Sequence, residues 1–173
     1  MSAYVMSRRL GGFGGSYGVA AGGVRFTSGD STQPTGLLEI LDGVAAGQCD
    51  QAFVKAFSIA GGGSLAIDLK GGGGELDLAN RPLALAKLRW LFLEITGPAA
   101  GKELRVGPQG AANAFQGWWP GVTAADKTPV WYQFEQADPQ DGWAVGASTK
   151  ILTISNPGGA AVAGFLCLAG TTS

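Results

Sequence analysis

The sequence contains no histidine, which removes several kinds of chemistry at once. A Ser-His-Asp triad and a Cys-His pair both depend on an imidazole that accepts the nucleophile's proton. Histidine ligands to zinc are excluded for the same reason. A pair of carboxylates is the acid–base arrangement that remains possible, so the acidic residues are the next place to look for a catalytic site.

Two groups of acidic residues lie close together in the sequence. They are Asp68, Glu75 and Asp77, and then Glu135, Asp138 and Asp141. A glycosidase holds two carboxylates at a defined separation in a cleft. Nothing in the sequence indicates a cleft, and these acids stand close to glycine or proline, as the acidic residues of turns do. We therefore interpret them as solvated turn residues and expect no enzyme activity.

Cofactors and metals have little support in the sequence. A Walker loop needs Lys-Ser or Lys-Thr after its last glycine, and neither "GGGSLAID" nor "GGGGELD" has it. The spaced aspartates of a calcium loop are absent. Cys49 and Cys167 form no CxxC motif, and a structural zinc site needs more ligands. We expect no cofactor, no metal and two buried free thiols; a disulfide between the two cysteines is the alternative.

The aromatic segment "AFQGWWPG" is the most unusual local feature, with Phe115, Trp118 and Trp119 close together. Tryptophan rings can stack on sugars or anchor a protein interface. Three interpretations stay open. One tryptophan fills the core while the other covers a loop, or the pair binds a protein, or the pair forms a platform for a glycan.

Charge and hydropathy argue against nucleic acid and membrane partners. The net charge is −1, and Arg8-Arg9 is the only adjacent basic pair, whereas nucleic acid binding needs a basic face. The apolar runs fall short of the roughly 20 residues of a spanning helix. The N-terminus lacks the apolar region of a secretory signal peptide. We therefore expect a protein that is made and kept in a cytoplasm until assembly or lysis.

Apolar residues at every second position predict β-strands over most of the chain. The clearest examples are residues 51–59, 64–69, 102–106 and 130–135, and glycine-rich turns separate them. Lys87 to Thr96 is expected to be a strand buried on both faces at its centre, with a helix as the alternative.

The end of the sequence has the same pattern. Residues 150–155 and 161–169 are expected to form a closing hairpin that turns at residues 156–159. With a short strand at 143–145, about eight or nine strands are expected. This pattern is typical of an antiparallel β-sandwich or barrel.

Residues 1–35 differ from the rest, because they combine Gly, Ser and Thr with isolated aromatic residues. Alone, such a segment buries too little surface to offset its ordering entropy. It is either a flexible tail or an extended arm that becomes ordered on a partner, and we favour the arm. We divide the chain into an arm, residues 1–35, and a β-sandwich domain, residues 36–173. The candidate partner-contact residues are Arg8, Arg9, Phe13, Tyr17, Phe26, Phe115, Trp118 and Trp119.

Residues 48–173 resemble a family of small structural proteins of tailed bacteriophages and prophages. The strand "LAKLRWLFLEIT", the segment "LRVGPQGAANAFQGWWPG", the strand "VWYQF", the turn "DGWAV" and the ending "KILTISNPGGAAVAGFLCLAGTTS" carry the resemblance. Upstream, "QCDQAFVKAFSIAGGGSLAIDL" is similar to the family's paired strands. These motifs are structural and not catalytic, and residues 1–35 match nothing clearly.

The resemblance implies a virion protein with a jelly-roll-like β-sandwich. Such proteins often form homotrimers that sit on the capsid as decoration or cement, or they occupy the neck, tail or fibre. The expected partner is therefore the major capsid protein or another virion protein, and the expected location is the virion, assembled in the host cytoplasm. Decoration of the capsid is the favoured function, with a neck, tail or fibre role and a carbohydrate-binding module as alternatives.

Overall fold

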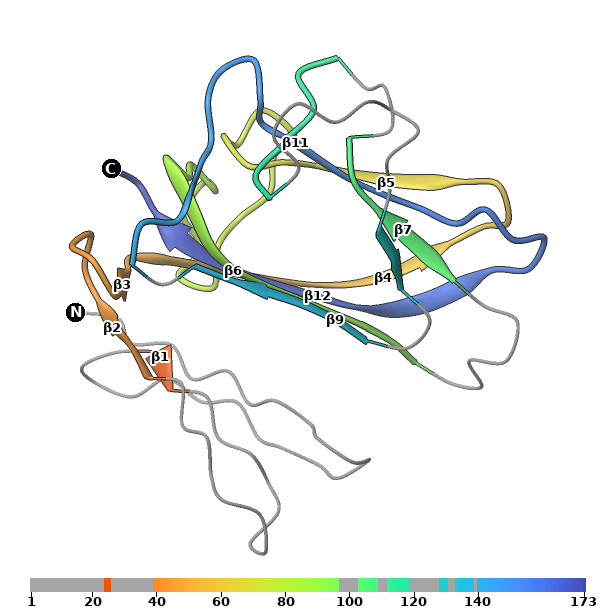
Figure 1. Cartoon of the computed structure of the whole chain (residues 1–173), viewed down its shortest axis with the longest axis horizontal. Coiled ribbons are helices and arrows are strands. Elements are labelled where there is room, and N and C mark those ends of the chain that lie inside the picture. The colour runs from red at the N-terminus through yellow and green to blue at the C-terminus, as the bar shows by residue number, and fades with distance from the viewer. Residues whose placement is uncertain are drawn as a thin grey trace, which may run out of the picture.

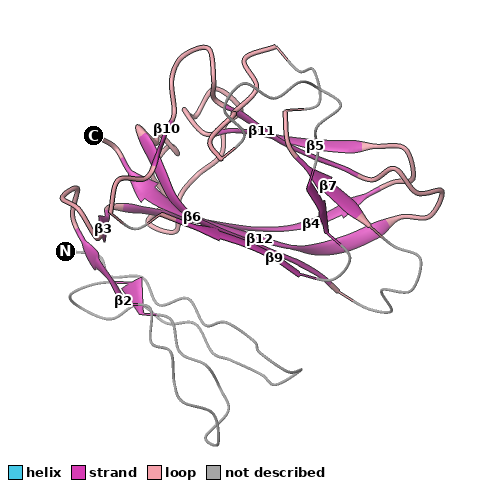
Figure 2. Ribbon diagram, in the orientation of Figure 1, coloured by secondary structure: helices cyan, strands magenta, loops and turns pink. Residues whose placement is uncertain are grey.

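The computed structural model describes residues 24–25, 39–96, 103–108, 112–118, 128–130, 133–138 and 140–173. Every regular element within these ranges is a strand, and the rest is turn or loop (Figure 2). The strands are β1 (Val24–Arg25), β2 (Glu39–Asp42), β3 (Gln48–Cys49), β4 (Gln51–Ile59), β5 (Ser64–Asp68), β6 (Lys87–Ile95), β7 (Leu104–Val106), β8 (Thr128–Val130), β9 (Gln133–Ala137), β10 (Trp143–Ala144), β11 (Ile151–Ser155) and β12 (Val162–Thr171).

Two antiparallel sheets face each other in the structure (Figure 1). One sheet has five strands in the order β10-β6-β12-β4, with β9 also paired to β6, and the other has four in the order β5-β11-β7-β8. A small third sheet, β1-β2-β3, lies beside the five-stranded sheet and away from the four-stranded one (Figure 1). The all-β prediction is confirmed and is consistent with a β-sandwich. The jelly-roll type stays a prediction, and the arm falls mostly outside the described residues.

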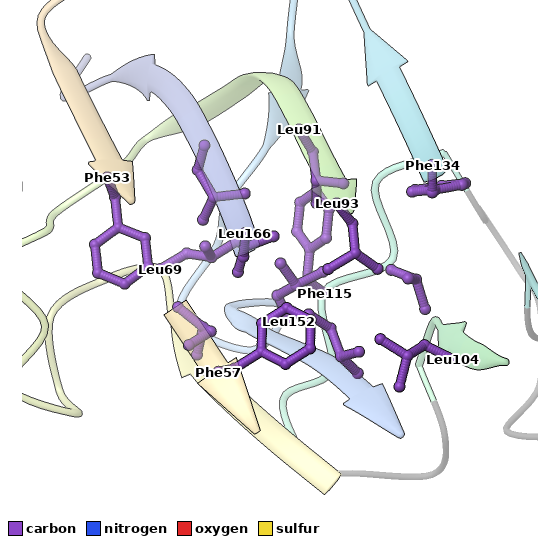
Figure 3. Packing of buried hydrophobic residues seen from close by; sticks show 14 of the residues in the cluster. Phe53, Phe57, Leu69, Leu91, Leu93, Leu104, Phe115, Phe134, Leu152 and Leu166 are labelled. Carbon is purple, nitrogen blue, oxygen red and sulfur yellow. The ribbon is translucent and has the colours of Figure 1, made fainter. Parts of the chain in front are cut away.

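The main core fills the space between the two sheets (Figure 3). In each strand the residues at alternate positions point inward, because side chains of a strand alternate between its two faces. The predicted inward face of β5 is confirmed, since Ile67 and Leu69 are fully buried. Other residues that meet in this core include Phe53, Phe57, Leu91, Leu93, Leu104, Phe115, Leu152, Ile154, Leu166 and Leu168.

Strand β6 confirms the prediction of a strand buried on both faces, and the helix alternative is wrong. It pairs with β12 along one side, and with β9 and then β10 along the other. Its inner face carries Leu91 and Leu93, and its outer face carries Trp90 and Phe92, all buried. A central strand with apolar side chains on both faces therefore explains the near-continuous apolar run.

The predicted closing hairpin is wrong, because β11 and β12 belong to different sheets. The segment between them crosses from one sheet to the other, and residues 60–63 do the same between β4 and β5. The two crossings lie against each other, since a Cβ on Gly61 would be 2.3 Å from the Gly159 carbonyl oxygen. In sequence, two apolar runs around a turn look the same whether the two strands pair within one sheet or lie in two sheets that face each other.

Asn156 joins these two crossings. Its side-chain amide donates to the carbonyl oxygens of Ile59, Ala60 and Ala160 at 2.8–3.2 Å, and its Oδ1 accepts from the Gly158 N–H at 3.0 Å. The side chain is buried, and both its amide nitrogen and its oxygen have hydrogen-bond partners. The predicted turn residue is thus an internal connector between the sheets.

The predicted strand over residues 130–135 is also divided between the sheets. Strand β8 pairs with β7 in the four-stranded sheet, and β9 pairs with β6 in the five-stranded sheet. The chain therefore changes sheet inside a segment whose alternation is nearly continuous. Period-two alternation reports that residues are extended and half-buried, but it does not report which sheet they join.

Candidate protein-binding surface

Most of the predicted partner-contact residues lie outside the described residues. These are Arg8, Arg9, Phe13, Tyr17, Phe26 and Trp119. Phe115 and Trp118 are described: Phe115 is a buried member of the main core, and Trp118 packs against that core. The prediction that residues 1–35 contact a partner therefore stays a prediction.

Phe115 and Trp118 pack against each other and against neighbouring aromatic rings. Phe115 is 1% exposed and Trp118 is half-buried. The Trp118 ring centroid lies 5.7 Å from that of Phe115, 5.8 Å from Phe134 and 4.9 Å from Trp143, in tilted or edge-to-face geometry. Such pairs add to the stability of a core. The arrangement agrees with the core-filling interpretation for Trp118, and Phe115 offers almost no surface to a partner.

A second apolar cluster covers part of the outer face of the five-stranded sheet. Its buried members are Cys49, Ala52, Trp90, Phe92 and Ala169. The Trp90 and Phe92 rings stack with centroids 5.9 Å apart and planes 4° apart, and they are only 3% and 6% exposed. The Trp90 Nε1 donates to Glu135 Oε1 at 3.0 Å. The outer face of a β-sandwich is often polar and exposed. The buried apolar residues of this cluster therefore show that other residues of the chain cover this part of the outer face.

Beside this cluster, the outer face of the sheet is still apolar but is exposed to solvent. Val54 on β4 is 39% exposed, and Phe165 on β12 is 46% exposed. In the β4–β12 ladder Val54 lies opposite Cys167, and Ala56 lies opposite Phe165. We call these four neighbouring residues, Val54, Ala56, Phe165 and Cys167, the outer strip. Contiguous exposed apolar surface of this kind is typical of a binding site.

The outer strip was missed in the sequence, although a signal for it exists. In the run "VAGFLCLAG" the inward positions carry Val162, Leu166 and Leu168, and the outward positions also carry Phe165 and Cys167. A strand that is apolar at both parities has two apolar faces. Only the register with β4 shows that the second face continues across two strands and is partly exposed.

Both thiols are free, as predicted, but only Cys49 is fully buried, and Cys167 is partly exposed. Burial raises the pKa of Cys49 to about 12, and the nearby Arg89 opposes this only in part. Burial, with a further contribution from Glu94, also raises the pKa of Cys167 to about 12. A thiol attacks as the thiolate, so neither residue is a nucleophile near neutral pH.

Arg89 holds neighbouring backbone in place at the edge of the outer face of the five-stranded sheet. It is the extra residue of a β-bulge, because Trp90 pairs with Ala169 while Leu88 pairs with the next residue of β12, Gly170. A bulge redirects a side chain out of the regular alternation. The guanidinium group of Arg89 is 2% exposed.

The guanidinium donates to backbone carbonyl oxygens of the loop that precedes β3. Its Nη1 donates to Gln48 O at 2.7 Å and also to Ala45 O, and its Nη2 donates to Val44 O at 3.3 Å. Gly142, with φ +71°, packs on the arginine stem, where a Cβ would lie 2.8 Å from Cγ. The buried arginine therefore holds the loop and β3 against the outer face.

The prediction that the acidic residues are solvated turn residues is wrong for several of them. Asp68 ends β5, Glu135 lies within β9 and accepts from Trp90, and both Asp68 and Asp77 are buried. Asp77 is buried and accepts hydrogen bonds from the backbone N–H groups of Ala79 and Arg81, and it forms an ion pair with the Arg81 side chain at 2.7 Å. Asp68 is also buried and forms an ion pair with Lys150 at 2.8 Å. These carboxylates are buried because the turns need them as hydrogen-bond acceptors.

No three histidine, cysteine, aspartate or glutamate residues gather into a metal-binding group within the described ranges. Over the same part of the chain, no helix has the length and apolar character needed to span a membrane. No protein-family model matches the sequence, and a search of curated proteins finds no significant match.

Proposed function

We propose that this chain is a structural protein of a bacteriophage particle: a decoration protein, assembled in the host cytoplasm, that binds the major capsid protein and stabilises the shell. The observation that supports this proposal is the outer strip, an apolar surface with Val54 and Phe165 exposed on a sheet of five strands. The resemblance of residues 48–173 to phage structural proteins supports the choice of a virion protein as the partner.

The outer strip suits a partner that is presented many times. Its exposed apolar area is small, so a single contact contributes only weakly. A capsid lattice repeats the same contact over its surface, and repetition raises the overall avidity. A rigid sheet loses little entropy on docking, because its strands are already paired.

The test is particle binding by a variant of the strip. Phe165→Ser removes the most exposed apolar ring of the strip, and Leu76→Ser is the matched control because Leu76 is 48% exposed but lies outside it. We expect Phe165→Ser to lose binding to particles that lack the protein, while Leu76→Ser binds like the unchanged chain. Equal binding by both variants would remove the outer strip from the proposal.

The copy number on purified particles distinguishes the location. Copies in the hundreds correspond to a capsid decoration protein, and a handful correspond to a neck, tail or fibre component. Quantitative mass spectrometry of purified virions gives this number. If the chain is missing from virions altogether, both locations are wrong.

A further inference from the structure

In the part of the chain that the structure describes, β4 is an edge strand, and most of the backbone groups on its free side have no partner. It pairs with β12 on one side, and in the described part of the chain the other side is met only at Ala52, where the carbonyl oxygen accepts from Leu78 N–H at 2.8 Å. Backbone groups of alternate residues in an antiparallel strand point to the same side. The N–H and C=O groups of Val54, Ala56 and Ser58 therefore also point outward, and all three residues are exposed.

The free edge has a defined beginning and end. It begins after Ala52, which Leu78 covers, and it ends at Ala60, where the chain turns towards the other sheet. The open stretch is thus Phe53 to Ile59, and Ala56 lies at its centre. An unpaired edge of this kind is a template for another strand.

We propose that the β4 edge binds the β4 edge of a second copy of this chain in an antiparallel pair, with a two-fold axis at Ala56. Ala56 then lies opposite Ala56, and Val54 lies opposite Ser58 of the second copy. These are residues whose backbone groups point outward, so each pair exchanges two hydrogen bonds. The five-stranded sheets of the two copies join into one continuous sheet.

Side-chain charge favours a second copy at this register. Lys55 lies opposite the uncharged Phe57 of the second copy, so its ammonium group meets no like charge directly across the pair. A two-fold axis at Lys55 would instead place two ammonium groups opposite each other, which is destabilising. The side chains at the pairing positions, Val54, Ala56 and Ser58, are uncharged, so no like charges meet at these positions.

The pairing is isologous, because the same strand is used on both sides and closes with two copies. It therefore differs from the trimer that the sequence resemblance implies. It also goes beyond the proposed function, since it holds whether or not the chain binds a capsid. One strand per copy makes a small interface, so we expect an equilibrium that depends on concentration.

The first measurement is the mass in solution by light scattering over a range of concentrations. We expect the mass to rise from that of the 17.5 kDa chain towards twice this value. Ala56→Pro removes an N–H that is unused in a single copy, and edge strands accept proline at such positions. This variant should lose the dimer, whereas Ala56→Ser, which keeps the N–H, should retain it.

The second measurement tests the register by cross-linking. Cα atoms of a hydrogen-bonded pair lie about 5.5 Å apart, within disulfide range. A background of Cys167→Ala is used, because Cys167 lies opposite position 54 within the same chain. Ala56→Cys should then form a disulfide dimer, Val54→Cys should not, and the double variant Val54→Cys with Ser58→Cys should.

Each outcome decides the proposal, even if Ala56→Pro fails to fold, because the cross-linking variants then stand alone. A mass that stays at one chain at all concentrations overturns it. Self-association that survives a folded Ala56→Pro, a mass of three chains, or equal cross-linking by Ala56→Cys and Val54→Cys overturns it as well. The proposal is also overturned if the chain does not self-associate and its β4 edge pairs with a strand of another protein instead.

Discussion

Asn156 shows how much of this fold depends on one polar side chain. It binds carbonyl groups of both sheet crossings, and the Asn156 residue itself is only 1% exposed. Removing the amide loses several hydrogen bonds between the crossings at once and leaves a gap where the buried side chain was, and both effects are costly. The residue that reads as a simple turn signal in sequence is therefore a main contributor to stability.

We predict that Asn156→Ala lowers the free energy of unfolding by about 2–4 kcal/mol, because several hydrogen bonds of a buried side chain are lost together. Urea denaturation followed by tryptophan fluorescence measures this change. Ser155→Ala is the control, half-buried on the neighbouring position of β11, and it should stay within about 0.5 kcal/mol. A loss for Asn156→Ala no larger than for Ser155→Ala would contradict the role of the amide.

Asp68 makes stability depend on acid pH. Burial acts to raise the pKa of its carboxyl, but hydrogen bonds from the Lys150 side chain and from the Lys70 and Gly72 backbone outweigh this effect, so its pKa lies below the ordinary 3.8. A carboxyl with a lowered pKa stabilises the folded chain fully above its ordinary value. This stabilisation is lost as the pH falls through the lowered pKa.

We predict that Asp68→Asn is less stable than the unchanged chain at neutral pH, and that the difference shrinks as the pH falls below 3.8. Urea denaturation of both proteins between neutral and about pH 2 measures it. The control is Glu103→Gln, because the Glu103–Arg105 ion pair is more exposed and surface pairs contribute little. A difference that does not change with pH would argue against a contribution from the Asp68 charge.

At the scale of elements, the bulge in β6 connects the sandwich to the segment before it. Arg89 leaves the regular alternation of β6 and reaches the loop at residues 43–48 through several hydrogen bonds. A lysine has one ammonium group in place of the planar fork, so it cannot reproduce these contacts. Arg89 therefore contributes to the position of β3 on the outer face, together with the β2–β3 pairing and the packing of Cys49.

We predict that Arg89→Lys increases hydrogen exchange of the backbone amides at residues 43–50 and lowers the free energy of unfolding by about 1–3 kcal/mol. Exchange followed by mass spectrometry reports the loop directly. Arg105→Lys, on the more exposed β7 position, is the control and should leave this loop unchanged. Unchanged exchange at 43–50 in Arg89→Lys would show that other contacts hold the loop.

The sequence is informative about strands and less so about their partners. Alternation at Phe53, Phe57 and Ile59, and at Ile67 and Leu69, correctly predicted which side chains form the core. The division of β11 from β12 and of β8 from β9 was not predicted, because pairing depends on residues far apart in the chain.

The candidate surface was harder to predict for a related reason. Exposure of Phe165 follows from the register of β12 with β4 and from where the second apolar cluster ends. The aromatic pair Phe115 and Trp118 attracted attention by its composition, but both rings pack at the core. Composition identifies unusual residues, and only the assembled sheet determines which face they occupy.

At the scale of the whole molecule, the main core is formed by residues from Phe53 onward. The loop that Arg89 holds also lies after residue 42. Within the described residues, the main core and the Arg89 contacts are therefore made by residues after position 42.

We predict that deletion of residues 1–30 leaves a folded domain that no longer binds phage particles. Circular dichroism and thermal unfolding measure the fold, and co-sedimentation with particles measures the binding. The full-length chain is the control in both. If the shortened protein decorates particles normally, residues 1–30 are only a tail.

Strand β12 is the last strand in sequence order, yet it lies between β6 and β4 in the five-stranded sheet. While the chain is being synthesised, β4 and β6 emerge from the ribosome first and have no central strand to pair with. Long-range pairing of this kind slows folding and exposes strand edges for longer. We therefore expect folding to wait until residues 162–171 have been released, with chaperones protecting the nascent strands until then.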